Sequence, residues 1–375
     1  MKPLKVLTVF GTRPEAVKMA PVVQQLAACP QVESHVILTA QHREMLDQVL
    51  SIFDIQPEID LNLMKPNQTL AETAAEILLH LDPILVKLQP DWVLVQGDTT
   101  TVVAASMAAF FRQVRVGHIE AGLRTHDKWQ PFPEEINRRI SGVIADFHFA
   151  PTEHARQNLL REGISDAHIA VTGNTQIDAL HQIVSRPAPA EVQEWLRAWG
   201  VASGEKRLIL VTAHRRENFG KPLEDICGAL LRLAEDPRLH IVYPVHLNPR
   251  VQETVYSRLG SVPNLTLTEP LDYLPMVHLE QAATLILTDS GGIQEEAAGL
   301  RKPALVLREK TERPEGVEAG VLRLVGSDPE RIYTETRRLL DDPAAYNQMA
   351  NAVNPFGDGH AAERILHALL EFKEQ

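Results

Sequence analysis

The sequence lacks the features that would connect it with nucleic acid, a membrane or a disulfide scaffold. Its 375 residues include only two cysteines, Cys29 and Cys227, which are far apart and form no CxxC pair, so neither a disulfide framework nor a zinc site is predicted. Basic residues number 37 against 49 acidic ones, and the formal net charge of −12 disfavours binding to a phosphate backbone. No apolar run approaches the ~18 residues of a membrane span. We therefore expect no nucleic-acid and no membrane partner.

Common signatures of cofactor and metal sites are also missing. The segment 11–18, GTRPEAVK, follows an apolar run but is not the GxGxxG fingerprint of a dinucleotide site. The chain has no DxD, HExxH or Walker A pattern, and no GxSxG elbow for a catalytic serine. We therefore expect no cofactor and no metal. The apolar run at 4–10 is too short for a signal peptide, which favours a cytoplasmic protein.

What the sequence does contain is a regular alternation of short apolar runs with amphipathic segments. In the first half the predicted buried strands are 4–10, 34–40, 92–97, 114–120, 146–151 and 168–173. In the second half they are 207–213, 240–245, 264–270, 284–290, 303–308 and 321–326. Buried strands that alternate with helices indicate parallel sheets built from βαβ units.

This alternation predicts an α/β protein with two Rossmann-like domains whose parallel sheets face a central cleft. We assign 1–185 to the first domain, 186–206 to a hinge, 207–358 to the second domain, and 359–375 to a C-terminal helix that packs back on the first. The hinge is assigned from its change to a Pro, Ala and Gly-Ser composition. In doubly wound sheets ligands bind beyond the carboxyl ends of the strands, so functional residues are expected there.

The segment 287–297, LTDSGGIQEEA, joins a predicted strand to a helix through small residues. Ser290, Gly291 and Gly292 leave the backbone N–H groups of the helix N-terminus open to a phosphate. An ordinary tight turn would explain these glycines equally well. Glu296, in the first turns of the helix, would repel a phosphate, and it is better placed to accept hydrogen bonds from ribose or sugar hydroxyls.

Three cations follow other strands. Arg13 and Lys18 lie at the start of the helix after the first strand, where the helix dipole already favours an anion. Arg313 lies in a Pro-Gly loop after a strand of the second half, where it is a candidate clamp for a diphosphate. Arg13 and Lys18 are equally compatible with a plain surface position.

Four carboxylates characterise the first half. Asp98 and Glu120 each end a predicted strand, and Glu134 and Glu135 begin a helix. Asp98 could simply cap the helix that starts near Thr99, and first-turn carboxylates such as Glu134 and Glu135 are favoured by the helix dipole alone. Glu120 has no such structural explanation, because it ends an apolar strand directly before Ala-Gly.

The second half places histidines and arginines after its first two strands. His214, Arg215 and Arg216 follow the first strand, and His246 follows the next. A single histidine is more often structural than catalytic, but His214 stands at a strand end where ligands are expected.

Ten motifs in order then carry a resemblance over nearly the whole chain. They are FGTRPEAVKMAP, AQHREML, QGDTTT, GHIEAGLRT, PFPEEINRR, VTGNTQIDAL, VTAHRREN, YPVHLNP, LTDSGGIQEEA and TERPEGVEAG. With them the chain closely resembles the bacterial non-hydrolysing UDP-N-acetylglucosamine 2-epimerase family. The resemblance implies the glycosyltransferase-B type of fold, interconversion of UDP-GlcNAc and UDP-ManNAc, a homodimer, no redox cofactor, and a role in polysaccharide biosynthesis.

The resemblance also implies a mechanism and a set of residues. UDP leaves C1 as the C2 proton is removed, which gives 2-acetamidoglucal, and UDP then adds back with a proton delivered to the opposite face. The catalytic groups would be Asp98, Glu120, Glu134 and His214. UDP and the sugar would be bound by Arg13, Lys18, Asp98, Glu120, His214, Leu271, Met276, Ser290, Gly291, Gly292, Glu296 and Arg313. Some relatives carry Gln and Phe at the positions of Leu271 and Met276, so contacts to the base are expected from backbone or apolar packing.

Some family members bind a second UDP-GlcNAc as an activator. The residues at the matching positions are Gln41, Glu44, Asn67, Glu134, Arg215 and His246. Glu44 and Asn67 stand where an activated relative has Gln and Arg, and loss of the Arg removes a phosphate partner, so activation stays open.

Three other functions share parts of these patterns. A hydrolysing 2-epimerase shares the elimination step but releases UDP and ManNAc. A glycosyltransferase of the same fold would need an acceptor groove and fewer carboxylates. A nucleotide-sugar-binding regulator would need the phosphate-binding residues but not Asp98, Glu120 and Glu134 together.

Overall fold

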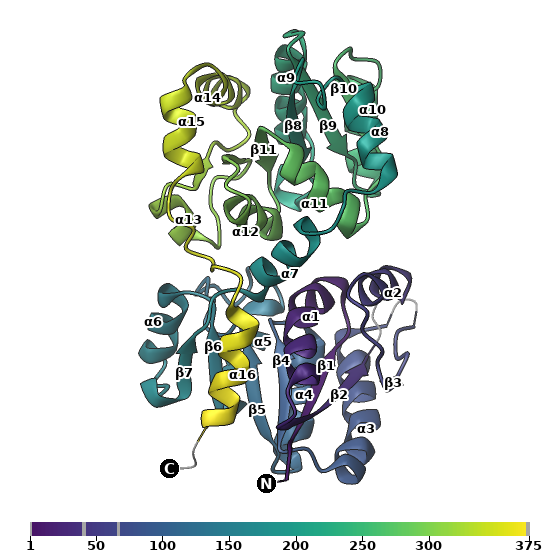
Figure 1. Ribbon diagram of the computed structural model, residues 1–375, viewed down its shortest axis with the longest axis vertical. Helices are drawn as coiled ribbons and strands as arrows, with labels where there is room; N and C mark the ends of the chain where they lie inside the picture. Colours follow the sequence, from purple (N-terminus) through teal and green to yellow (C-terminus); the bar gives the residue numbers. More distant parts are fainter. Residues whose placement is uncertain (1, 40–42, 66–67, 373–375) are drawn as a thin grey trace. The chain divides into compact units, whose positions relative to one another are not determined.

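The computed structural model describes residues 2–39, 43–65 and 68–372, and the chain divides into two compact units (Figure 1). Unit 1 comprises Met1–Ala179 and Gly357–Gln375, and unit 2 comprises Leu180–Phe356. Each unit has a parallel sheet covered by helices, which confirms the prediction of two Rossmann-like domains with parallel sheets. The segment predicted as a hinge, 186–206, contains a helix, α8 (Ala190–Ala198).

Unit 1 is built on a seven-stranded sheet in the order β3-β2-β1-β4-β5-β6-β7, with every pair parallel. Its strands are β1 (Leu4–Phe10), β2 (Val32–Leu38), β3 (Ile59–Asp60), β4 (Trp92–Gln96), β5 (Arg115–Ile119), β6 (Phe147–Ala150) and β7 (Ile169–Val171). Its helices are α1 (Arg13–Ala28), α2 (Arg43–Ile52), α3 (Leu70–Leu88), α4 (Thr100–Phe111), α5 (Glu134–Ile144), α6 (Glu153–Arg161), a 3-10 turn (Asp166–His168), α7 (Thr175–Val184), which runs on into unit 2, and α16 (Ala361–Glu371).

The helices of unit 1 cover both faces of its sheet. The chain moves outward from β1 to β2 and back across to β4, so right-handed crossovers place α1 and α3 on opposite faces. On the first face α16 packs against α1, and Phe372 meets the ring of Trp92 edge-on at 4.9 Å. On the second face α3, α4 and α5 pack in a row. The C-terminal segment therefore belongs to unit 1.

Unit 2 repeats this plan with six parallel strands in the order β10-β9-β8-β11-β12-β13. Its strands are β8 (Arg207–Thr212), β9 (Leu239–Pro244), β10 (Leu265–Thr268), β11 (Leu285–Thr288), β12 (Ala304–Val306) and β13 (Leu322–Leu324). Its helices are α8, a 3-10 turn (Arg216–Asn218), α9 (Lys221–Ala234), α10 (Pro249–Leu259), α11 (Tyr273–Ala282), α12 (Gly291–Gly299), α13 (Pro314–Glu318), α14 (Pro329–Asp341) and α15 (Pro343–Ala350). Helix α9 packs between α10 and α14 over an apolar core of strand residues such as Ile209, Ile241 and Leu285.

The order of strands reverses direction once in each unit. The reversal lies between β1 and β4 in unit 1, and between β8 and β11 in unit 2. At such a switch point the two following helices run to opposite faces, and the turns after the two strands are left open to a ligand. The turns after β1, β4, β8 and β11 are therefore where a site is expected in each unit.

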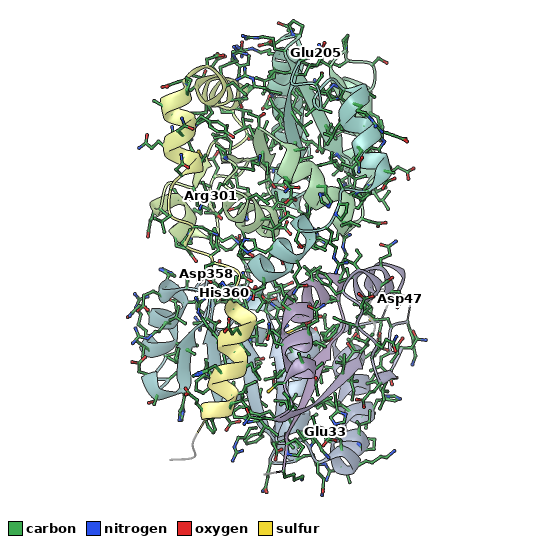
Figure 2. The ribbon with its side chains drawn as sticks, viewed as in Figure 1. Glu33, Asp47, Glu205, Arg301, Asp358 and His360 are labelled. Atoms are coloured by element: carbon green, nitrogen blue, oxygen red, sulfur yellow. The ribbon has the colours of Figure 1, made fainter. Side chains whose placement is uncertain are left out.

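In the parts of the chain that the structure describes, no helix is both long and apolar enough to cross a membrane. Figure 2 shows the side chains on the ribbon, and the labelled charged residues Glu205, Arg301 and Asp358 are exposed.

Candidate active site

In unit 1 the structure brings three of the predicted residues together. Glu120 directly follows β5, and its carboxylate forms an ion pair with Lys18 of α1. Asp98 follows the neighbouring strand β4, and its carboxylate binds Arg138 of α5. Arg138 also donates a hydrogen bond to the backbone oxygen of Glu120 and lies 3.4 Å from its carboxylate. Two cations and two carboxylates thus form one cluster at the carboxyl ends of the strands.

Arg138 links the cluster, and it was not among the residues predicted from the sequence. Its side chain is 6% exposed. Burial lowers the pKa of Arg138, but Asp98 and Glu120 outweigh burial and raise it overall, so the guanidinium stays charged. A signal for this role was present, because Arg138 follows Glu134 by four residues and such residues share one face of a helix.

The backbone at Glu120 is strained. Its φ angle is +61°, in the left-handed region that residues with a side chain rarely adopt. Such a conformation costs on the order of 1 kcal/mol and persists only where the surroundings enforce it. Here the two contacts of Glu120 with Arg138 and the ion pair with Lys18 hold it in place. Backbone strain is common at functional sites, which supports the sequence-based choice of Glu120.

Asp98 does not cap the helix that follows it. The N-cap of α4 is Thr99, whose hydroxyl accepts a hydrogen bond from the N–H of Val102 at 3.3 Å. The backbone oxygen of Asp98 instead accepts from Asn137 of α5 at 2.8 Å, while its carboxylate pairs with Arg138. Helix α5 therefore binds both the backbone oxygen and the carboxylate of Asp98.

The structure separates the two adjacent carboxylates of α5. Glu135 is buried and accepts hydrogen bonds from the N–H groups of Thr125 and His126, so it stabilises the loop after β5. Glu134 begins the same helix, and its Oε2 is buried with no hydrogen-bond partner among the described residues. Of the two, only Glu134 has a carboxylate oxygen available for a ligand, on the same face of α5 as Arg138.

A further buried carboxylate, Glu15, organises the switch point of unit 1. Its Oε2 accepts from the N–H groups of Gly11 and Thr12 after β1, and its Oε1 accepts from the hydroxyl of Thr99 after β4 at 2.6 Å. Burial raises the pKa of Glu15, and these hydrogen bonds oppose that shift. Glu15 was not predicted, although the T-x-x-E spacing of Thr12 and Glu15 is the sequence signal of a capping box. Arg13, the first residue of α1, is half-buried beside this turn.

In unit 2 His214 and His246 lie together after neighbouring strands. Their rings stack in parallel, with centroids 5.1 Å apart and planes inclined by 9°. The N–H groups of His214 and Arg215 both donate to the carboxylate of Asp289, which follows β11. Burial lowers the pKa of His214, Asp289 opposes this, and His246 and Arg215 lower it further, so the imidazole is neutral at pH 7.

The structure explains Gly291. A Cβ atom at Gly291 would lie 2.6 Å from Nη1 of Arg313, so a larger residue there would require this guanidinium to move. Arg313 in turn donates from Nε to Glu295 at 2.8 Å. A Cβ atom at Gly292 would meet nothing within 4 Å, and the N-cap Ser290 makes no side-chain capping bond. The N-terminus of α12 therefore lies beside Arg313 and has no side-chain cap from Ser290.

Glu296 is also buried, one turn further along α12. Burial and the adjacent Glu296 carboxylate raise the pKa of Glu280 well above its usual value, so Glu280 is neutral at pH 7. Leu271 precedes α11 and Met276 lies within it, and both are half-buried.

Part of the predicted activator set cannot be placed. Gln41, Asn67 and the side chain of Glu44 lie outside the described residues. Of the others, Glu134 belongs to unit 1, and Arg215 and His246 belong to unit 2. No group of three or more His, Cys, Asp or Glu in the described ranges is arranged to hold a metal ion.

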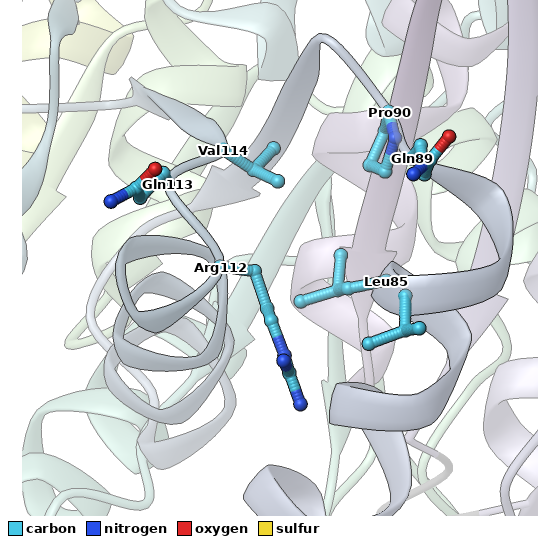
Figure 3. Close-up of a pocket in the computed structure, with 7 residues that line it drawn as sticks. Leu85, Gln89, Pro90, Arg112, Gln113 and Val114 are labelled. Carbon is cyan, nitrogen blue, oxygen red and sulfur yellow. The ribbon is translucent and has the colours of Figure 1, made fainter.

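Unit 1 also has a pocket of about 400 Å³ away from this cluster (Figure 3). It is lined by Leu85, Val86, Gln89, Pro90, Arg112, Gln113 and Val114. These residues end α3 and α4 and precede β4 and β5, so the pocket lies at the amino ends of the strands. Ligands of doubly wound sheets bind at the opposite edge, and this pocket is not the candidate active site.

Comparison with known proteins gives a consistent result. The family model described as UDP-N-acetylglucosamine 2-epimerase matches residues 24–370. The UDP-N-acetylglucosamine 2-epimerase of Salmonella typhimurium is 55% identical over 373 residues, which cover 99% of either chain. That of Bacillus subtilis is 52% identical over 375 residues, covering 99% of this chain and 96% of the relative.

Solved structures agree. The UDP-GlcNAc 2-epimerase of Neisseria meningitidis bound to UDP-GlcNAc has a TM-score of 0.91 and 49% identity, covering 98% of this chain and 100% of that one. The enzyme of Methanocaldococcus jannaschii in complex with UDP-GlcNAc and UDP has a TM-score of 0.80 and 35% identity, covering 98% and 99%.

The buried ion cluster predicts a large difference between two adjacent arginines of α5. Arg138→Met leaves two carboxylates without their shared cation and should lower the free energy of unfolding by about 3–5 kcal/mol. Arg139→Met, which removes a half-exposed arginine paired with Glu135, should cost less than about 1 kcal/mol. Urea unfolding measures both variants, and equal losses would contradict the role of Arg138.

Proposed function

Because the chain belongs to the UDP-N-acetylglucosamine 2-epimerase family, we propose that it interconverts UDP-GlcNAc and UDP-ManNAc without releasing the free sugar. The observation that carries this proposal is the cluster of Lys18, Asp98, Glu120 and Arg138 at the strand ends of unit 1, with Glu134 on the same helix face as Arg138. Such a group of carboxylates is needed for proton transfer, whereas binding of a nucleotide sugar alone does not require it.

The proposed reaction has two steps. A carboxylate removes the C2 proton, the electrons of that C–H bond form the C1=C2 double bond, and the bond from C1 to the UDP oxygen breaks. UDP then adds back to C1 while a proton is delivered to C2 from the opposite face. Asp98, Glu120 and Glu134 supply the acid and base groups, since the two faces of the sugar each need one. His214 stabilises the negative charge of the departing diphosphate.

UDP is proposed to bind at the N-terminus of α12. Arg313 and the N-terminus of α12 at Gly291 and Gly292, which Ser290 does not cap with its side chain, suit a diphosphate, because a cation and a helix N-terminus both attract an anion. Glu296 suits the ribose hydroxyls as an acceptor. We propose that the uracil binds near Leu271 and Met276.

A homodimer and a cytoplasmic location are part of this proposal. The helices α3, α4 and α5, which pack in a row, carry exposed apolar side chains at Leu79, Val86, Phe110, Phe111 and Val143. Phe110 and Phe111 are 61% and 62% exposed, and Val143 is 85% exposed. Apolar side chains in such number are typical of a surface that a second copy covers. The product UDP-ManNAc would serve the synthesis of surface polysaccharides.

Proton and phosphorus NMR of the purified protein with UDP-GlcNAc in deuterated water tests the reaction. UDP-ManNAc should appear with deuterium at C2, because the proton that returns comes from solvent. Glu120→Gln should keep the fold and lose nearly all turnover, since it retains the shape but not the basicity of the carboxylate. Release of UDP and ManNAc would show the hydrolysing reaction instead, and binding without turnover would show a regulator.

Two glycines of unit 2 test the diphosphate site. Gly292→Ala should fold normally but weaken UDP binding by about tenfold, because a methyl group would cover the N–H groups that approach the phosphate. Gly228→Ala on α9 is the matched control, because a Cβ atom there also meets nothing within 4 Å and lies on a different helix. Calorimetric titration with UDP measures both, and equal affinities would place the diphosphate elsewhere.

The dimer has its own test. Phe111→Asp should convert the protein to monomers, because a charge on the proposed interface cannot be buried without a partner. Val353→Asp, at an 82% exposed apolar residue of unit 2, is the control and should leave the dimer intact. Analytical ultracentrifugation distinguishes the two states, and a native protein that sediments as a monomer would contradict the proposal.

A further inference from the structure

Asp289 is the most completely buried acidic residue at the strand ends of unit 2. It directly follows β11 and is 0% exposed. Its Oδ2 accepts three hydrogen bonds, from the N–H groups of His214 and Arg215 at 2.8 Å and from the side-chain amide of Asn218 at 2.9 Å. Asn218 also donates to the backbone oxygen of Leu307, just after β12. One carboxylate oxygen thus fixes the turn that carries His214.

The second oxygen of Asp289 faces the ring of His214. Oδ1 lies 3.6 Å from Nδ1 of His214, and it has no hydrogen-bond partner among the described residues. A distance of 3.6 Å is slightly longer than a hydrogen bond but within the range of an ion pair. The ring plane is fixed as well, since His246 stacks on it. The imidazole therefore has a carboxylate at Nδ1, an aromatic face beside it, and Nε2 as its remaining polar atom.

From this geometry we propose that Asp289 is a positioning residue that keeps the proton of neutral His214 on Nδ1 and so presents Nε2 to the ligand. A carboxylate oxygen only accepts, so the ring nitrogen facing it carries the hydrogen. The tautomer of a histidine is commonly fixed in this way by the partner of its other nitrogen. Asp289 thus determines which ring nitrogen of His214 can accept a proton or contact the ligand.

The position of the proton on His214 affects how this residue interacts with a bound diphosphate. This part of the inference rests on the proposed function. In the free protein His214 is neutral, because burial, Arg215 and His246 lower its pKa more than Asp289 raises it. An arriving diphosphate adds negative charge, which favours uptake of a proton from solvent at Nε2. The resulting imidazolium has Asp289 at Nδ1 and the phosphate at Nε2. His214 then carries positive charge at the place where UDP accumulates negative charge on leaving.

The test is Asp289→Asn. Three N–H donors converge on the position of Oδ2, so the amide oxygen must occupy that position and its NH₂ group must face Nδ1. A donor opposite Nδ1 shifts the proton to Nε2. Long-range proton–nitrogen NMR of protein labelled with ¹⁵N-histidine reports the tautomer, and His214→Gln identifies the signal. We expect Nδ1–H in the native protein, Nε2–H in the variant, and a lower pKa of His214 in the variant because the carboxylate is lost.

Turnover gives the second readout. Asp289→Asn should lower kcat by about tenfold or more, as for other carboxylates that orient a histidine. In a His214→Gln background the same change should cost nothing further, because Asp289 acts through His214. Asp342→Asn is the matched control: Asp342 also accepts two backbone N–H groups, of Ala344 and Ala345, but at the start of α15. It should leave both kcat and the tautomer unchanged.

Two results would overturn the inference. One is an unchanged tautomer of His214 in Asp289→Asn, and the other is a full loss of kcat from Asp289→Asn in the His214→Gln background. The tautomer is measured without substrate, so its outcome is independent of whether the protein epimerises UDP-GlcNAc. A failure of the proposed reaction and a failure of this inference are therefore distinguishable.

Discussion

The arrangement of unit 1 depends on burying a cation between carboxylates that follow different strands. Arg138 is charged and almost fully enclosed, which is costly unless its hydrogen bonds are satisfied. Asp98 and Glu120 satisfy them, and Lys18 balances the remaining charge of Glu120. Because these contacts join β4, β5, α1 and α5, the cluster fixes the relative positions of the groups proposed to transfer protons. A loop-borne carboxylate without such contacts would not be held at a defined place.

In both units a buried carboxylate accepts hydrogen bonds from backbone N–H groups at the switch point of the sheet. In unit 1 the buried Glu15 accepts from the N–H groups of Gly11 and Thr12 and binds Thr99 after the neighbouring strand. In unit 2 the buried Asp289 accepts from the N–H groups after β8 while it follows β11 itself. A turn at a switch point has N–H groups with no strand or helix partner, and a buried carboxylate can satisfy several at once. These two carboxylates therefore shape the turns, whereas other residues carry the proposed chemistry.

The fold could be predicted from the sequence because the alternation of apolar strands and helical segments is repeated along the chain. Each buried strand is a run of β-branched and aliphatic residues, and the parallel connection follows from the helical segment between runs. The two-residue strand β3 was not predicted, since Ile59 and Asp60 form no run and both are exposed. The helix α8 within 186–206 was also hidden, because the composition of that segment is typical of a linker.

The sequence by itself determined the two Rossmann-like units, the strand ends at which Asp98, Glu120, His214 and Ser290 lie, and the family. These features follow from local sequence patterns and from the order of segments along the chain. They do not depend on contacts with distant residues. Only the tertiary structure decided which charges meet. Arg138 pairs with Asp98 and Glu120, 40 and 18 positions away, and Asp289 serves His214 from 75 positions away. The guanidinium of the distant Arg313 occupies the space beside Gly291, whereas a Cβ atom at Gly292 would meet nothing within 4 Å. Such pairings arise from sheet order and helix placement, and the spacing of residues along one chain does not encode them.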